Sequence, residues 1–161
     1  MSTHNFKKEG LEYIVMKVYI AYETDEDHPD PYGDSVPSEI DTLSHTIEDA
    51  TGWKTFNLLR DVLNWKRHEL GLPELLARAK NEIDKSDLII TYLSEKSLFV
   101  YFEAAYAKAI GKKVIVIHRE DEPASPLWQL ADFRFSYGDE EDMEERLKEI
   151  KTKLSANHRI L

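Results

Sequence analysis

The chain has no cysteine, and this absence removes several kinds of chemistry. Without thiols the protein forms no disulfide, has no thiolate nucleophile and binds no zinc through cysteine. No window comes near the roughly 18 apolar residues that span a bilayer. The opening stretch MSTHNFKKEG also lacks the apolar core of a signal peptide. We therefore expect a cytoplasmic protein that is not bound to a membrane.

Basic residues are also scarce, since 21 of them face 31 acidic residues and the net charge is −10. A field of that sign disfavours a long polyanion, so we expect no binding to DNA or RNA. A small anionic substrate is still compatible, because local Arg and Lys dominate within a Debye length of about 10 Å. Walker loops, G-x-G-x-x-G and a Ser-His-Asp grouping are missing as well, which leaves kinases, dehydrogenases and hydrolases of those types unsupported.

What the sequence does have is a regular alternation of strand and helix patterns. Its 161 residues, 42% of them hydrophobic, predict one domain over residues 1–161 with a substantial core. Apolar runs rich in β-branched and aromatic residues predict strands at 14–22, 53–59, 87–93 and 113–118, and we expect a fifth at 132–137. Helical spacing predicts helices at 38–52, 74–87, 97–110 and 139–154, while 62–70 is ambiguous. Ser38 is the expected cap of the first helix, and Gly111 closes the third.

This order predicts an α/β fold: a three-layer, flavodoxin-like or Rossmann-like parallel sheet with helices on both faces. In such sheets ligands bind outside the carboxyl ends of the strands, at a switch in strand order. The rule gathers candidate residues from four stretches of the chain, which are 21–30, 59–61, 94–103 and 118–121.

Glu103 is the most unusual residue among these candidates. It is the one carboxylate in the apolar and aromatic run SLFVYFEAAYAKAIGKK. A charge that loses water must be paired, neutralised or used. One interpretation makes Glu103 a nucleophile or acid/base group in an apolar pocket, and the other pairs it with Lys108 or Lys112 or leaves it solvated. The residues alone leave both open.

The segment FEAAYAKAIGKKVIVI resembles the nucleoside 2-deoxyribosyltransferase superfamily, in which a catalytic Glu precedes a helix of small residues, Gly-Lys and a strand. That superfamily includes deoxyribonucleoside 5′-monophosphate N-glycosidases, and SLFVYFE resembles their segment before the Glu. The stretches KVYIAY, Arg60-Asp61, KSDLIITYL and DFRFSYGDEEDMEERL fall in the same order. The resemblance covers most of the chain, although its specific part is about thirty residues long.

The resemblance implies an enzyme that cleaves or transfers an N-glycosidic bond of a nucleoside or nucleotide. Glu103 would attack the anomeric carbon and form a covalent glycosyl-enzyme, which water or another base then resolves. Ser97 would orient the sugar, and Asp61 or another loop carboxylate would assist departure of the base. A homo-oligomer is implied, and no cofactor. From the residues themselves, Arg60 suits a phosphate or carboxylate, or a pair with Asp61 or Glu69. The aromatic residues that would line the base pocket or pack in the core are Tyr22, Phe99 and Tyr101.

Two departures from that pattern indicate a changed substrate or a lost activity. Phe99 and Tyr101 stand where the family has glycines, and Ala79 stands where a sugar-facing Asp is frequent. The chain is also similar to bacterial Toll/interleukin-1 receptor (TIR) domains, where a Ser-x-aromatic pattern, here Ser97 and Phe99, precedes the Glu that cleaves NAD. A TIR-like NAD glycohydrolase or signalling domain is therefore the first alternative. A non-catalytic nucleotide-binding or interaction module is the second.

An acidic loop follows the first predicted strand and contains Asp25, Asp27, His28, Asp30 and Asp34. It lacks the ordered ligand spacing and terminal Glu of an EF-hand. We therefore expect no metal site and interpret the segment as a solvated loop or a substrate lid.

Overall fold

The computed structural model describes residues 6–8, 11–13, 15–22, 35–62, 70–93, 98–121 and 125–158. Five parallel strands form the main sheet, in the order β4-β3-β5-β6-β7. Their bounds are β3 (Lys17–Ala21), β4 (Lys54–Phe56), β5 (Leu88–Leu93), β6 (Lys113–Arg119) and β7 (Phe133–Tyr137). A separate antiparallel pair, β1 (Phe6–Lys8) and β2 (Leu11–Tyr13), precedes the sheet and was not foreseen from the sequence.

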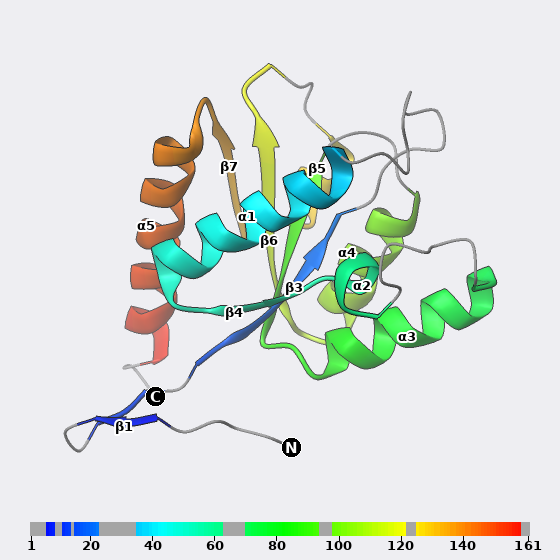
Figure 1. The fold of residues 1–161 in the computed structure, drawn as a ribbon, viewed down its shortest axis with the longest axis horizontal. Coiled ribbons are helices and arrows are strands. Elements are labelled where there is room, and N and C mark those ends of the chain that lie inside the picture. Colours follow the sequence, from blue (N-terminus) through cyan, green and yellow to red (C-terminus); the bar gives the residue numbers. More distant parts are fainter. Residues whose placement is uncertain are drawn as a thin grey trace.

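Helices cover both faces of the sheet, which confirms the predicted three-layer α/β architecture (Figure 1). One face carries α1 (Ser35–Thr51) and α5 (Glu140–His158), and the other carries α3 (Leu72–Asp84) and α4 (Leu98–Ala109). Two short elements complete the described chain, α2 (Leu58–Asp61) and the 3-10 helix η2 (Pro126–Gln129). Among the described residues, no helix is both long and apolar enough to cross a membrane.

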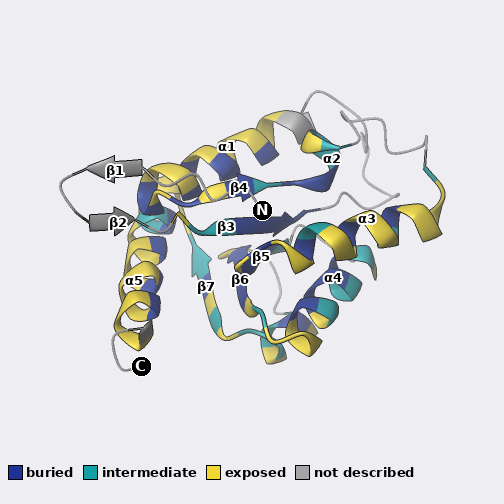
Figure 2. Cartoon of the chain, turned by 90° about the horizontal axis from the view of Figure 1, so that it is seen from below, coloured by how far each residue is buried: buried dark blue, intermediate teal, exposed yellow. Residues whose placement is uncertain are grey.

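The core has two layers because successive side chains of a strand point to opposite faces. On β3, Val18 and Ile20 pack under α1 and α5, whereas Tyr19 and Ala21 pack under α3 and α4. The central strands are buried on both faces, so their sequences are almost continuously apolar rather than alternating. Figure 2 shows the consequence, with helices dark blue where they face the sheet and yellow where they face solvent.

The second predicted strand is too long, because a capping interaction ends it. β4 stops at Phe56, and Asn57 then caps α2 by accepting a hydrogen bond from the backbone N–H of Arg60 at 3.1 Å. The amide of Asn57 also donates to the carbonyl of Ile20 at 3.0 Å, which ties this turn to β3. Local hydrogen bonding by Asn competes with the ladder and starts a helical turn instead.

The start of the first helix also differs from the prediction. α1 begins at Ser35, so Ser38 lies inside the helix and is not its N-terminal cap. Gly111 does close α4, as predicted, with a backbone φ of 82° that favours glycine. The N–H of Lys112 donates to the carbonyl of Ala107 and the N–H of Gly111 to that of Lys108, which is the Schellman arrangement.

Candidate active site

The topological switch point of the sheet lies between β3 and β5. From β3 the chain first moves outward to β4, then returns to the other side of β3 to form β5, and continues outward to β6 and β7. In parallel α/β folds, ligands commonly bind outside the carboxyl ends of the strands at such a switch point. The helix α4 follows β5, and its residues contact β3, β5 and β6.

Glu103 belongs to α4, and its side chain is only 3% exposed. The hydroxyl of Tyr19, on β3, donates a hydrogen bond of 2.5 Å to its Oε1. Tyr19 itself is fully buried, so the contact takes place inside the protein. A phenol hydroxyl that bonds a buried carboxylate holds the carboxylate oxygen in one position. The structure thus fixes one acidic group against the strand that borders the switch point.

The predicted pairing of Glu103 with Lys108 or Lys112 is wrong. Lys108 donates to Asp132 at 2.8 Å, and Lys112 donates to the backbone carbonyl of Asp84 at 3.2 Å. Both lysines are thus held away from Glu103, on the outer side and the end of α4. Solvation is excluded by the burial of Glu103. Burying a carboxylate costs several kcal/mol or more unless its hydrogen bonds are met, and the Tyr19 hydroxyl supplies one of them here.

Two predicted substrate residues, Phe99 and Tyr101, lie on the same helix as Glu103. Both are half-buried and pack against the core layer under α3 and α4. The hydroxyl of Tyr101 lies 2.9 Å from Oγ of Ser125, at the start of η2. Ser97, the predicted sugar-orienting residue, falls outside the described residues, as does the acidic loop with Asp25, Asp27, His28, Asp30 and Asp34.

Arg60 and Asp61 lie on α2 and form an ion pair at 2.9 Å. Arg60 also donates to Oγ of Ser44 on α1 at 2.6 Å and to the carbonyl of Thr55 at 3.2 Å. Burial lowers the pKa of Arg60, but the hydrogen bond and charge of Asp61 raise it more, so the net pKa is raised. Oδ2 of Asp61 accepts from the N–H of Asn57 at 2.8 Å. The pair therefore braces α2 against β4 and α1.

Tyr22 lies on the opposite face of the sheet from Glu103. It belongs to the core layer under α1 and α5, and its hydroxyl donates to Oε2 of Glu39 on α1. The three-residue offset from Tyr19 explains this, because an odd offset along a strand reverses the direction of the side chain. The structure does not bring Tyr22 together with Glu103.

Tyr19 is the site residue that sequence reasoning missed, although two signals were present. A tyrosine inside an otherwise apolar buried strand needs a partner for its hydroxyl, and a glutamate inside an apolar helix needs a donor. Tyr19 also shares its face of the sheet with Ala21, on the side that α4 covers. Matching these two requirements would have paired Tyr19 with Glu103.

His118 ends β6 on the same face as Glu103 and is 4% exposed. Its Nδ1 lies 2.7 Å from the carbonyl of Arg119, and its ring centroid lies 4.4 Å from that of Trp128. Nε2 of His118 and Nε1 of Trp128 are both buried without a hydrogen-bond partner in the described part of the chain. Within those same residues, His, Asp and Glu side chains nowhere gather in threes that could hold a metal.

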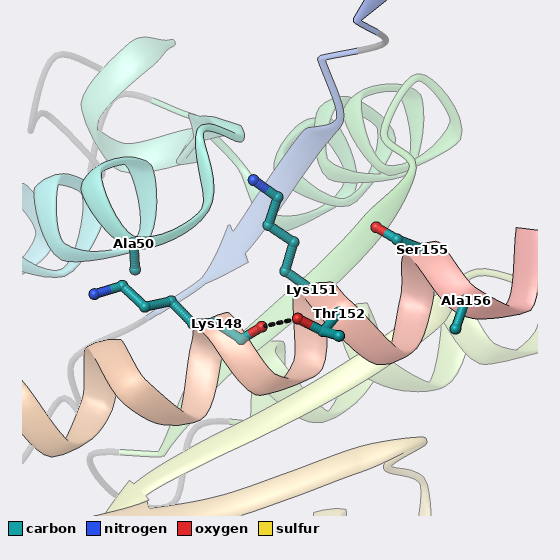
Figure 3. Close-up of a pocket in the computed structure, with 6 residues that line it drawn as sticks. All are labelled: Ala50, Lys148, Lys151, Thr152, Ser155 and Ala156. Atoms are coloured by element: carbon teal, nitrogen blue, oxygen red, sulfur yellow. Dashed lines mark hydrogen bonds between the residues drawn. The ribbon is translucent and has the colours of Figure 1, made fainter.

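An open depression of about 500 Å³ lies along the second half of α5, and Figure 3 shows the residues that line it. Its lining includes Ala50 of α1 and the lysines Lys148 and Lys151 of α5. Lys148 is paired with Glu144 at 3.4 Å, and the hydroxyl of Thr152 donates to the carbonyl of Lys148 at 3.0 Å. The groups in this depression are therefore mostly engaged with their own helix.

Comparison with solved structures confirms the predicted fold. The chain is similar to the CMP N-glycosidase BcmB of Clostridium botulinum, with a TM-score of 0.58 and 18% identity, over 83% of this chain and 98% of that one. It is similar to the 2-deoxyribosyltransferase of Bacillus psychrosaccharolyticus, with a TM-score of 0.54 and 14% identity, over 80% and 90% of the two chains.

A third solved structure, a conserved protein from Enterococcus faecalis V583, gives a TM-score of 0.60 at 15% identity, over 84% of this chain and 99% of that one. No protein-family model matches the sequence, and no curated protein matches it. The likeness therefore lies in the fold.

Proposed function

We propose that the protein cleaves or transfers the N-glycosidic bond of a nucleoside or nucleotide, with Glu103 as the nucleophile. The observation that carries this proposal is the buried carboxylate of Glu103, held by the Tyr19 hydroxyl beside the switch point of the sheet. The fold shared with an N-glycosidase and a deoxyribosyltransferase supports it. Because one fold hosts many activities, the proposal rests on the site rather than on the fold.

The chemistry suits a single carboxylate. A carboxylate oxygen of Glu103 attacks C1′ of the sugar while the C1′–N bond breaks, and the electron pair of that bond leaves with the base, which takes up a proton from solvent water. The transition state is oxocarbenium-like, so the adjacent negative charge stabilises it. Attack by water on the glycosyl ester then gives the free sugar, or attack by a second base gives a new nucleoside. Either step restores the carboxylate.

Other residues have narrower roles in the proposal. Ser97, six residues before Glu103, is the residue expected to orient the sugar, and Phe99 and Tyr101 line the approach along α4. Asp61, acting while paired with Arg60, is the candidate for assisting departure of the base. Tyr22 has no role in this site, because its side chain lies under α1. A cytoplasmic homo-oligomer remains part of the proposal on the strength of the sequence resemblance.

Chromatography of released base tests the proposal. The wild type, Glu103→Gln and the control Glu149→Gln are incubated separately with deoxynucleosides, CMP, dCMP and NAD. Glu149 is an exposed carboxylate on α5, across the sheet from Glu103. We expect base release by the wild type and by Glu149→Gln, and none above background by Glu103→Gln.

Each other outcome has a definite meaning. Release of nicotinamide from NAD alone would favour the TIR-like alternative, with Glu103 still the catalytic group. Release that persists in Glu103→Gln would contradict the assignment of the nucleophile. No release from any substrate by folded protein would overturn the enzymatic proposal and favour a nucleotide-binding module.

A further inference from the structure

A second pocket, of about 220 Å³, opens between α1 and α5 at the carboxyl edge of the sheet. It lies on the face opposite to Glu103 and shares no lining residue with the candidate active site. Three tyrosines line it, one from the end of each of three strands, together with two glutamates and one arginine. We call it the tyrosine pocket, and its defining residues are Tyr22, Tyr92, Tyr137, Glu39, Glu140 and Arg119.

The tyrosines form one wall because all three face the α1 and α5 side of the sheet: Tyr22 directly follows β3, Tyr92 is the next-to-last residue of β5 and Tyr137 is the last of β7. The rings of Tyr22 and Tyr92 stack with centroids 5.1 Å apart. The hydroxyls of Tyr92 and Tyr137 lie 2.8 Å apart, with ring centroids at 6.4 Å. Buried Leu43 and Met143 lie beneath, which makes the floor apolar. Such a wall is held in place by packing before any ligand arrives.

The two carboxylates of the tyrosine pocket are each only partly used. Glu39 accepts from the Tyr22 hydroxyl through Oε2, and Glu140 accepts from the Thr46 hydroxyl through Oε1 at 3.0 Å. In the part of the chain that the structure describes, the second oxygen of each carboxylate has no hydrogen-bond partner. These two glutamates come from different helices, so the pocket offers acceptors from two sides.

Among the described residues of the lining the cation is Arg119, and it has an acidic neighbour, since its Nε lies 3.7 Å from Oδ1 of Asp121. The lining therefore has a net negative formal charge within a protein of net charge −10. That balance disfavours an anionic ligand and favours a cationic one.

From these observations we propose that the tyrosine pocket binds a small organic cation, an ammonium group on a short apolar stem. An ammonium has several N–H donors and no acceptor, which matches the two open carboxylate oxygens of Glu39 and Glu140. Phenol rings attract cations through their π faces, and the apolar floor accommodates the stem. The proposal is independent of the chemistry at Glu103, and its failure leaves the proposed function unaffected.

Titration with three ligands that share one stem tests the charge preference. Amide chemical shifts of the full chain are followed during addition of n-butylammonium, n-butanol or n-butyrate at constant ionic strength. We expect n-butylammonium to bind at least about tenfold more tightly than either of the others. We also expect its shifts to concentrate in α1, α5 and the ends of β5 and β7. Equal or tighter binding of butyrate, or shifts elsewhere in the chain, would overturn the proposal.

Substitution then tests the two carboxylates. Glu39→Gln and Glu140→Gln keep the side-chain shape and remove the charge, so each should weaken n-butylammonium binding by roughly tenfold. The control is Glu141→Gln, which removes an exposed charge from the next position of the same helix, outside the pocket. Unchanged affinity in both pocket variants, or an equal loss in Glu141→Gln, would also overturn the proposal. The three ligand titrations of the wild-type protein test the proposal without any variant. The test therefore remains decisive even if a variant fails to fold.

Discussion

The phenol oxygen of Tyr19 lies 2.5 Å from Oε1 of Glu103, although 84 positions separate the two residues in the sequence. Both side chains are buried, and each has a polar end that needs a partner there. The contact joins β3 to α4 on one side of the switch point, where ligands bind in folds of this kind. The proposed cleavage or transfer of an N-glycosidic bond depends on that pair.

Tyr19→Phe tests the role of the hydroxyl in holding Glu103. The change removes the donor and keeps the ring, so the carboxylate loses a fixed hydrogen bond. We expect kcat for base release to fall at least about tenfold, and the free energy of unfolding to fall by about 1–3 kcal/mol. Kinetic assays and denaturant unfolding measure the two effects.

The matched control for that variant is Tyr106→Phe. Tyr106 lies on the same helix as Glu103, but its hydroxyl donates to Asp84 at 2.7 Å on the exposed side. Its removal should leave kcat unchanged. A Tyr19→Phe protein with the kcat of the wild type would show that the hydroxyl does not position the nucleophile.

The sequence predicted the fold well because its strands are unusually clear. Runs such as LIITYL (88–93) and KVIVIH (113–118) are apolar throughout, which is typical of parallel strands covered on both faces. Gly111 marked the end of α4 for a physical reason, since glycine adopts the positive φ of this position more readily than other residues do. The end of β4 was missed because the capping bond of Asn57 depends on three-dimensional geometry that a hydrophobic pattern does not contain.

The candidate site was predictable only in part. Glu103 was recognised because a carboxylate in an apolar helix is rare enough to need a reason. Tyr22 was placed in the wrong layer of the protein because it follows the strand end, and its direction depends on which residues of β3 face α4. Tyr19 was missed because its hydroxyl is inconspicuous in a sequence that has eight tyrosines.

Gly111→Ala tests the helix end that follows Glu103. A Cβ at this position would meet no atom within 4 Å, so the expected cost comes from the backbone φ of 82° alone. We expect the free energy of unfolding to fall by about 1–2 kcal/mol. Gly71→Ala is the control, because Gly71 has a φ of −70° that alanine adopts readily. Equal stability of the two variants in denaturant would contradict the assigned strain.

Asp132 contributes to the free energy of unfolding by an amount that depends on pH. Burial alone would raise the pKa of Asp132, but hydrogen bonds from Lys108 and the N–H of Val114, with the charge of Lys113, lower it below its ordinary value. A lowered pKa in the folded state means that the stabilisation is present above the unfolded-state pKa of about 3.9 and is lost as pH falls below it.

Denaturant unfolding of the wild type and Asp132→Asn over a range of pH measures this contribution. At about pH 6 the wild type should be more stable by less than about 1 kcal/mol, because solvent screens the charges around Asp132, and the difference should shrink toward zero by about pH 2. Asp121→Asn is the control, since its exposed pair with Arg119 at 3.7 Å is screened by solvent. A difference for Asp132→Asn that does not change with pH would contradict the assigned cause.

Mass spectrometry of the acid-quenched reaction tests the central claim most directly. Whole-protein mass is measured during turnover of the substrate that releases base, and proteolysis then locates any added mass. The account predicts an adduct equal to the glycosyl group, carried by the peptide that contains Glu103 and absent from Glu103→Gln. An adduct on another residue, or turnover in Glu103→Gln at the rate of the wild type, would contradict it.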